Sequence, residues 1–309
     1  MTDKKLYLTR AQLISELGRC LGCKSKPCMN ACPVNCNPQE FIAKAKANDF
    51  AGAVETITRN NPMGQTCGLI CPDKFCMQAC TRAGIDFPIN IPRVQATILE
   101  KYRTAETAAH PKLPANGKKV AVIGAGPAGI AATAELSRLG YRITLFESFE
   151  KIGGALNLIP DKRLPFEVIA KDWSFIDDPD MIELRLNTPV NNPAALLEQD
   201  FDGVIVATGE PEGINLGIDG EEHAVSYLDY LRHPEHYAAR GNIAVIGGGA
   251  VATDCALTAV NNGAENVEMF VRRRVSDMRV TGEERKSLLD AGVDLTTMTK
   301  IKKIGADGD

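Results

Sequence analysis

Cys20-x2-Cys23-x4-Cys28-x3-Cys32-Pro33 and Cys67-x3-Cys71-Pro72-x3-Cys76-x3-Cys80 together hold eight of the ten cysteines of this chain, and Cys36 lies just beyond the first group. Thiols gathered in this way form disulfides, bind zinc or hold iron-sulfur clusters. The surrounding N-terminal region must fold around whichever of these chemistries applies.

The spacing favours iron-sulfur clusters. Met1 to Arg10 carries charges but no apolar segment or cleavage site, which predicts a reduced, cytoplasmic chain without disulfides. Zinc sites use pairs of short Cys-x2-Cys arms, often with histidine, whereas only Cys20 and Cys23 form such a pair and no histidine lies near them. In ferredoxins a Cys-x2-Cys pair precedes further cysteines and a Cys-Pro, and the last cysteine of a run can bind the other of two clusters. We therefore expect two 4Fe-4S clusters, with zinc as the alternative.

Length and charge exclude several classes of protein. A chain of 309 residues with this composition predicts two or three ordinary globular domains. The net charge of -4 argues against nucleic acid as a partner. The longest apolar runs, such as Val120 to Ile123, have the length of a strand, so no membrane-spanning segment is expected.

The region around the cysteines has a helical pattern. Apolar residues recur at helical spacing from Leu8 to Arg19, with Thr9 as the expected cap, and a pair of short helices is expected from Pro38 to Ile57. Another helix is expected to run past Gln95 to about Arg103, and the proline-containing segment 104–116 predicts a linker.

A strand, a glycine loop and a helix follow the linker. Val120 to Ile123 leads into Gly124-x-Gly126-x-x-Gly129, a helix is expected from Ala131 to Leu139, and a second strand, Arg142 to Phe146, ends at Glu147. This order is the full dinucleotide-binding fingerprint. Its glycines let the backbone approach a pyrophosphate at the start of the helix, and its acid accepts hydrogen bonds from a ribose.

The segment after Glu147 is expected to contain one loop and two strands. Gly153-Gly154 and Ile159 to Pro165 predict a loop, and Leu184 to Val190 predicts a strand. Phe201 to Gly209 predicts a buried strand that ends in a tight turn.

The fingerprint then recurs. Ala244 to Ile246 leads into Gly247-x-Gly249-x-x-Ala252, followed by an expected helix from Thr253 to Asn261 and a strand from Val267 to Val271. No acid matches Glu147 here, and Arg272, Arg273 and Arg274 follow the strand instead. Cations at this point favour the 2'-phosphate of NADPH over the 2'-hydroxyl of NADH, and the alternative is a solvated basic strand end.

Two nucleotide folds and two clusters in one chain predict electron transfer. Nicotinamide donates two electrons together whereas clusters pass one, so FAD is expected in the first fold and nicotinamide in the second. A disulfide reductase is not favoured, because no cysteine pair follows Gly154. The expected architecture is a helical iron-sulfur domain (1–112), a Rossmann-like α/β FAD domain (113–212), and a second Rossmann-like fold (213–309) that is incomplete at the C-terminus.

The sequence resembles the NADPH-oxidising FAD and iron-sulfur module shared by dihydropyrimidine dehydrogenases and the small subunit of glutamate synthase. The resemblance runs through all 309 residues. The stretches from Asn61 to Pro72 and from Cys80 to Gln95 are most similar to the dihydropyrimidine dehydrogenase branch, in which one cluster has a glutamine ligand.

The resemblance implies which residues hold each group. It implies one cluster on Cys20, Cys23, Cys28 and Cys80, and another on Cys32, Cys71, Cys76 and Gln95. Cys36 and Cys67 become spare, whereas the spacing alone would put ligation by cysteine throughout first. For FAD it implies Gly124, Ala125, Gly126, Pro127, Ala128, Gly129, Glu147, Gly153, Gly154, Arg163 and Val190. For the nicotinamide nucleotide it implies, beside Gly247 of the fingerprint, Gly248, Gly249, Ala250, Val251, Arg272, Arg273 and Arg279.

The resemblance further implies an electron-input subunit of a hetero-oligomer. NADPH would reduce FAD by hydride transfer, and electrons would pass through both clusters to an FMN-containing partner that reduces uracil or thymine. No catalytic acid or base is expected in this chain.

Two alternatives remain. One is the small subunit of glutamate synthase, whose partner is the large subunit. The other, of a different class, is a non-catalytic cluster-binding module. It is motivated by the C-terminus, where Asp307 to Asp309 are expected to form a hairpin turn and the family's returning flavin-binding segment does not follow.

Overall fold

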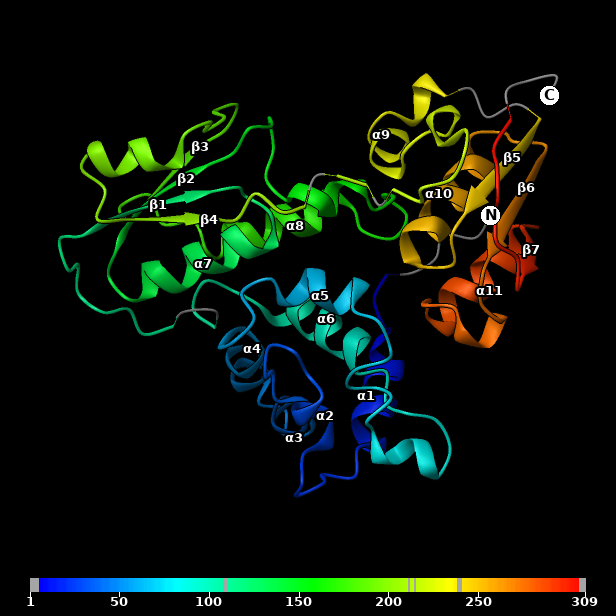
Figure 1. The fold of residues 1–309 in the computed structure, drawn as a ribbon. Helices are drawn as coiled ribbons and strands as arrows, with labels where there is room; N and C mark the ends of the chain where they lie inside the picture. Colours follow the sequence, from blue (N-terminus) through cyan, green and yellow to red (C-terminus); the bar gives the residue numbers. More distant parts are fainter. Residues whose placement is uncertain (1–5, 108–109, 211, 214, 238–240, 306–309) are drawn as a thin grey trace. The chain divides into compact units, whose positions relative to one another are not determined.

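The computed structural model describes residues 6–107, 110–210, 212–213, 215–237 and 241–305 (Figure 1). The turn expected at Asp307 to Asp309 lies outside these ranges. The chain divides into two compact units, of which the first comprises Met1–Leu156 and Asp161–Gly209. The second comprises Asn157–Pro160 and Glu210–Asp309.

Helices build the N-terminal part of the first unit. The α1 helix begins with a capping box, in which Thr9 Oγ1 accepts a hydrogen bond from the Gln12 amide and the Gln12 side chain accepts one from the Thr9 amide. Side chains of Asn37, Asp49 and Asn90 cap three later helices in a similar way. The elements are α1 (Arg10–Arg19), α2 (Pro27–Asn30), α3 (Pro38–Lys46), α4 (Phe50–Thr58), α5 (Gly64–Ile70), the 3-10 turn η1 (Thr81–Gly84) and α6 (Ile91–Tyr102).

The apolar faces of these helices meet in one core, and thiols lie both within it and against it. Phe41, Ile57 and Ile98 are fully buried there, as expected for helix packing. Cys36 and Cys76 belong to the core itself. Four further cysteines pack against it, namely Cys20, Cys28, Cys32 and Cys80. The helical prediction for this region is confirmed, and its core is shared between apolar side chains and thiols.

A parallel four-stranded sheet in the order β3-β2-β1-β4 forms the rest of the first unit. Buried apolar strands β1 and β2 lie at its centre, and Ile123 pairs with Phe146 on one side and Val206 on the other. The elements are β1 (Lys119–Ile123), α7 (Pro127–Arg138), β2 (Arg142–Phe146), η2 (Gly154–Leu158), α8 (Phe166–Ser174), β3 (Ile182–Arg185), η3 (Pro193–Glu198) and β4 (Gly203–Val206).

Two strand predictions in this sheet need correction. The strand expected from Leu184 to Val190 is instead β3, which begins at Ile182 and ends at Arg185. Beyond it, the amides of Asn187 and Thr188 donate hydrogen bonds to the carbonyls of Phe149 and Glu147. The strand expected from Phe201 to Gly209 is reduced to β4, which lies at an edge of the sheet and is only partly buried.

The second unit holds a parallel three-stranded sheet in the order β5-β6-β7. Its core includes Met269, Ala256 and Leu288, and Cys255 is buried in it as a small apolar side chain. The elements are η4 (Glu221–His223), α9 (Tyr227–Arg232), η5 (Pro234–His236), β5 (Asn242–Ile246), α10 (Ala250–Asn261), β6 (Asn266–Val271), η6 (Val275–Asp277), α11 (Gly282–Asp290) and β7 (Asp294–Thr297).

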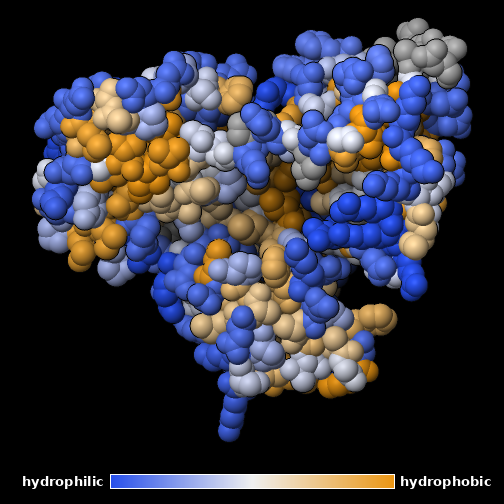
Figure 2. Space-filling model, viewed as in Figure 1, coloured by the Kyte–Doolittle hydropathy of each residue, from blue (hydrophilic) through white to orange (hydrophobic). Residues whose placement is uncertain are grey.

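Some apolar side chains of the first unit remain on the surface. Apolar side chains, drawn in orange, gather over the β1–β4 sheet on the face that Figure 2 shows. Leu197 in η3 and Val206 at the end of β4 are each more than half exposed. Within the described residues, no helix combines the length and apolar character that crossing a bilayer requires.

Candidate functional site

Four thiols, which we call the first thiol group, lie around a single cavity; they belong to Cys20, Cys23, Cys28 and Cys80. Cys20 caps the end of α1, Cys28 lies in α2, and Cys80 immediately precedes η1. Cys23 is in the loop between them, and its thiol lies 3.5 Å from Thr81 Oγ1. The cavity is lined by these four cysteines and by Leu21, Pro27, Gln39, Ile42, Thr81, Arg82, Ile89 and Ile91. The chain thus brings together four thiols that lie up to 60 positions apart in sequence.

The second thiol group consists of Cys32, Cys36, Cys67, Cys71 and Cys76. Burial raises the pKa of Cys76 to about 12, and the neighbouring thiolates of Cys71 and Cys32 add to the rise. Burial likewise raises the pKa of Cys36, next to Cys32, Cys76 and Cys67. Cys36 and Cys67, the two cysteines that the resemblance leaves spare, therefore lie among the predicted ligands.

Gln95 reaches this second group from helix α6. Its side-chain amide is buried, and Nε2 donates a 2.7 Å hydrogen bond to the Gly64 carbonyl. Oε1 lies 3.7 Å from the sulfur of Cys36, which donates to it. The bond to Gly64 fixes the amide so that its oxygen, the atom able to bind a metal, faces the thiol of Cys36.

The thiol spacing does not suit a single zinc ion. Among the described residues, only His233, Glu235 and His236 form a group of three or more ligand side chains with all ligand atoms within 4.8 Å of one another. Sulfurs on one tetrahedral zinc, with Zn–S bonds of about 2.3 Å, would lie closer than that.

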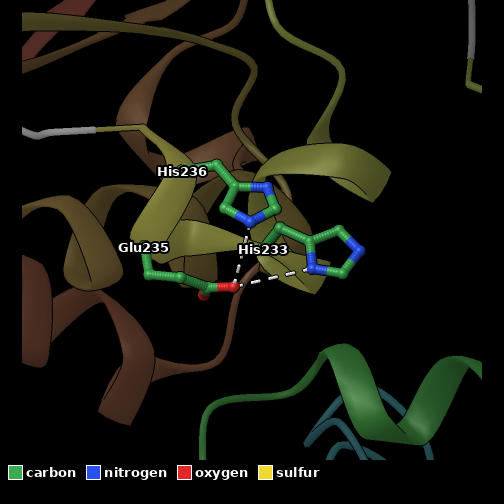
Figure 3. A group of neighbouring side chains, drawn as sticks. All are labelled: His233, Glu235 and His236. Atoms are coloured by element: carbon green, nitrogen blue, oxygen red, sulfur yellow. Dashed lines mark ion pairs between the residues drawn. The ribbon is translucent and has the colours of Figure 1, made fainter.

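The histidine group belongs to the surface of the second unit. Figure 3 shows one oxygen of the Glu235 carboxylate facing both imidazoles, 3.6 Å from His233 Nδ1 and 3.7 Å from His236 Nε2. The two rings stack with centroids 4.9 Å apart, and all three side chains are exposed. The ion pairs account for this arrangement, so we do not count it among the sites.

The first glycine loop has the geometry that a nucleotide needs. A Cβ on Gly129 would lie 1.8 Å from the Gly124 carbonyl oxygen, so only glycine lets α7 come this close to the strand end. Gly124 has φ +103, a conformation that favours glycine. A Cβ on Gly126, by contrast, would meet nothing nearer than 3.9 Å, which leaves space in front of the loop.

Glu147 is buried behind this loop. Its Oε2 accepts a 2.7 Å hydrogen bond from the Ala125 amide. Its Oε1 accepts hydrogen bonds from Ser148 Oγ and from the Phe149 amide. A carboxylate has about four acceptor sites, so one remains on Oε2 for a ribose hydroxyl.

Other predicted FAD residues lie at varying distances from the loop. The Gly153 amide donates to the Ala125 carbonyl, and a Cβ on Gly154 would lie 3.0 Å from the Gly126 Cα, so this turn packs directly on the loop. Pro127 and Ala128 form the exposed first turn of α7. Val190 packs beside Phe146 at the end of β2, whereas Arg163 is half-buried ahead of α8.

The second glycine loop lies beside one of the predicted arginines. Gly247 has φ +143 and donates its amide to the Phe270 carbonyl. The Arg279 amide donates to the Gly248 carbonyl, so Arg279 is held against the loop. Ala250 and Val251 begin α10, and Arg272 and Arg273 directly follow β6. The exposed guanidinium groups of Arg272 and Arg279 are thus at the carboxyl ends of the strands, where ligands bind in open parallel sheets.

Sequence reasoning missed a buried ion pair next to the second thiol group. Arg103 and Asp172 have side chains 3% and 0% exposed, and Nη1 of the arginine lies 2.6 Å from Oδ1 of the aspartate. A pattern was available to find it, because Asp172 shares one face of α8 with the buried Val168 and Ile169. An acid on an apolar helix face indicates a buried partner.

Three family models match successive parts of the chain. Dihydropyrimidine dehydrogenase domain II, 4Fe-4S cluster, matches residues 1–107. The NAD(P)-binding Rossmann-like domain matches residues 122–173, and pyridine nucleotide-disulphide oxidoreductase matches residues 178–309. These matches confirm the predicted class of fold, with a helical iron-sulfur domain ahead of Rossmann-like nucleotide-binding folds.

Curated relatives match almost the whole chain. The NAD-dependent dihydropyrimidine dehydrogenase subunit PreT of Escherichia coli K12 is 34% identical over 91% of this chain and 70% of its own length. The PreT homolog of Salmonella typhi is 35% identical over the same shares. Among solved structures, histamine dehydrogenase from Rhizobium sp. 4-9 is similar in fold, with a TM-score of 0.54 and 20% identity over 91% of this chain and 40% of that one.

Proposed function

The chain belongs to the family of the NAD-dependent dihydropyrimidine dehydrogenase subunit PreT, and from this premise we propose that it is the electron-input subunit of a two-component reductase. It is an oxidoreductase of the flavin and iron-sulfur class. The observation that carries the proposal is the presence, in one chain, of two thiol groups on a shared helical core and of two glycine loops, each on its own parallel sheet.

The thiol groups are proposed to hold two 4Fe-4S clusters. Cys20, Cys23, Cys28 and Cys80 would bind the first, which is supported by the cavity they line together. Cys32, Cys71, Cys76 and Gln95 would bind the second, with Cys36 and Cys67 as buried neighbours. The orientation of the Gln95 amide supports its role as the oxygen ligand.

The first glycine loop is proposed to hold FAD. Amides at the start of α7 would donate to the pyrophosphate, and the free acceptor site on Glu147 would take a ribose hydroxyl. Gly153 and Gly154 keep side chains away from the loop, and Val190 gives the neighbouring surface an apolar character. Arg163 would contribute a positive charge toward the flavin nucleotide.

The second loop is proposed to hold NADPH. The loop residues 247–251 would receive the pyrophosphate, and Arg272, Arg273 and Arg279 would surround a 2'-phosphate. The curated relatives are named NAD-dependent, which does not itself favour NADPH. The proposal of NADPH therefore rests on these arginines alone. We also propose domain boundaries near 112/113 and 212/213, and a cytoplasmic location.

When bound, the nicotinamide supplies a hydride, the flavin divides the electron pair, and the clusters carry electrons singly. The side chains of this chain bind and orient these groups, and none is proposed as a catalytic acid or base. Chemistry on the final substrate would belong to a partner subunit. Because the curated relatives are named as dihydropyrimidine dehydrogenase subunits, we propose an FMN-containing pyrimidine reductase acting on uracil or thymine.

The glutamate synthase large subunit is the alternative partner. It would require the same input groups and differs only in the acceptor. A mixing experiment separates the two: the chain, NADPH and a pyrimidine-reducing subunit should convert uracil, whereas conversion of glutamine and 2-oxoglutarate with the large subunit would favour the alternative.

An anaerobic titration with NADPH tests the proposal itself. Flavin and cluster absorbance are recorded together on the purified chain after reconstitution with iron, sulfide and FAD. We expect both to bleach, because both sites are fed from one nucleotide. A chain that binds clusters but takes no electrons from either NADPH or NADH would be a non-catalytic cluster-binding module, and the proposal would be wrong.

A further inference from the structure

A single carboxylate joins the flavin-binding fold to α5, which carries Cys67, and to the end of α6, which carries Gln95. Asp172 lies on α8, which follows the first glycine loop in the chain. Its Oδ2 accepts a 2.8 Å hydrogen bond from the Thr66 amide, and its Oδ1 lies 3.4 Å from the Gln65 amide. Both amides belong to the first turn of α5.

The α5 helix depends on this contact because it lacks a cap of its own. The residue before it, Met63, makes no capping hydrogen bond from its side chain. The helix carries Cys67 and ends at Cys71, whose amide donates to the Cys67 carbonyl. The position of the Asp172 carboxylate therefore fixes the start of the helix whose end presents a proposed cluster ligand.

Arg103 connects the same carboxylate to α6. It lies directly after this helix, which also carries Gln95, and its Nη1 donates a 2.6 Å hydrogen bond to Asp172 Oδ1. Nη2 donates to the Pro62 carbonyl, and the guanidinium lies 4.2 Å from the centre of the Phe175 ring. Both members of the pair are held from more than one side, which favours a fixed geometry over a mobile one.

The charges of this pair are close enough to act on the thiols. The carboxylate of Asp172 bonds the amide of Thr66, the residue directly before Cys67, and Arg103 bonds the same carboxylate. In a dry interior such charges are weakly screened. Net charge near a cluster is one of the factors that set its reduction potential.

We propose that Asp172, paired with Arg103, is a positioning residue for the second cluster: the pair holds α5 and α6 against α8, and the balance of its two charges sets how readily that cluster accepts an electron. The inference rests on the proposed function, since it needs a cluster on Cys32, Cys71, Cys76 and Gln95. Loss of the aspartate charge leaves a net positive group nearby and favours reduction. Loss of the arginine charge does the opposite.

The test measures the potentials of both clusters in the full chain, reconstituted anaerobically and poised with dithionite and mediators without any nucleotide. Asp172→Asn should raise the equilibrium constant for one-electron reduction of the second cluster roughly tenfold, which is the effect of one unit charge at an assumed separation of about 10 Å and an effective dielectric constant near 20. Tenfold corresponds to about 59 mV for one electron. Arg103→Gln should lower the constant by a similar factor.

Because a lone buried charge can prevent folding, the paired variant Asp172→Asn with Arg103→Gln is made as well, and its potential should return close to that of the unmodified chain. Asp178→Asn is the matched control, since this carboxylate follows the same helix but pairs with the half-exposed Lys112, and it should shift neither potential. Cys71→Ser identifies which paramagnetic signal belongs to the second cluster.

Three results would overturn the inference. The first is a second cluster whose potential is unchanged in both single variants. The second is a shift in the same direction in both. The third is a shift that the first cluster shares. A chain that takes up fewer than two clusters would contradict the ligand proposal as well, whereas two clusters that dithionite reduces but NADPH does not would contradict only the proposed function.

Discussion

Gln95 is the residue at which two ligand sets for the second cluster compete. Cys36 and Gln95 lie side by side in the buried interior, with the thiol 3.7 Å from the amide oxygen, so proximity alone favours neither. The hydrogen bond from Gln95 Nε2 to the Gly64 carbonyl distinguishes the two residues as ligands. It holds the amide with its oxygen toward the Cys36 thiol. This geometry favours the glutamine as ligand and the cysteine as its neighbour.

We therefore expect Gln95→Leu to lose the second cluster, so that iron falls from about eight to about four atoms per chain. Cys36→Ala is the matched control, since it removes a buried thiol from the same place and should leave iron content unchanged. Iron and sulfide analysis after anaerobic reconstitution provides the measurement. If Cys36→Ala loses the cluster and Gln95→Leu keeps it, ligation is by cysteine alone.

Arg272 and Arg273 determine the expected nucleotide preference. A 2'-phosphate needs cations where a ribose-binding site has an acid, and the second loop has arginines after β6 where the first has Glu147 after β2. Arg272→Glu with Arg273→Ala should lower kcat/KM for NADPH at least tenfold and leave that for NADH within about twofold, since each lost phosphate contact is worth about 1.5–3 kcal/mol. Lys300→Ala is the control, with a cation lost elsewhere in the same unit. An unchanged preference would refute the phosphate assignment.

In the first glycine loop, which leads into α7, glycine is needed for two different reasons: Gly129 for close packing and Gly126 for space in front of the loop. A Cβ on Gly129 would collide with the Gly124 carbonyl at 1.8 Å, whereas one on Gly126 would touch only the Gly154 Cα at 3.9 Å. Gly129→Ala should therefore destabilise the fold by about 1–3 kcal/mol and lose flavin. Gly126→Ala should keep its stability and still lose flavin, because its methyl group points into space that a pyrophosphate needs. Thermal unfolding and bound-flavin absorbance measure the two effects, and a Gly126→Ala chain with full flavin would contradict the proposed site.

Elements bounded by glycine loops were predictable, and those fixed by tertiary contacts were not. The strands β1, β2, β5 and β6 belong to the two repeated fingerprints, and their expected positions match to within two residues. The α5 helix escaped prediction because Gly64 and Gly68 are poor helix formers. A Cβ on Gly68 would lie 2.7 Å from the Pro92 carbonyl and the Ala96 amide, so glycine is present for close packing on α6.

The thiol sites divide in the same way. Local spacing predicted iron-sulfur chemistry, because Cys-x2-Cys and Cys-Pro are adjacent in the chain. Spacing could not show that Cys80, from the second run of cysteines in the sequence, lies beside Cys20. The two meet only after α3 to α6 have packed. The hydrogen bond from the Thr66 amide to Asp172 joins residues even farther apart in sequence. It forms only when α8 packs against α5, more than 100 positions earlier in the chain.

The two compact units have separate cores, and only the first contains the clustered thiols. Cys36 and Cys76 are part of the first core and four more cysteines pack against it, whereas Cys255 is the one cysteine in the second core. Clusters bound to the first core add their binding free energy to its folding. The second core gains nothing from them.

Iron removal should therefore act on one unit alone. Calorimetry on the chain is expected to give two transitions, because separate compact units unfold separately. If bound clusters contribute roughly 4 kcal/mol, their removal by oxidation and chelation should lower the midpoint temperature of the first unit's transition by on the order of 10 °C. The second transition should stay within about 1 °C and serves as the internal control. A common shift of both transitions would mean that the units unfold as one, and an unshifted first transition would mean that the thiols hold no structural metal.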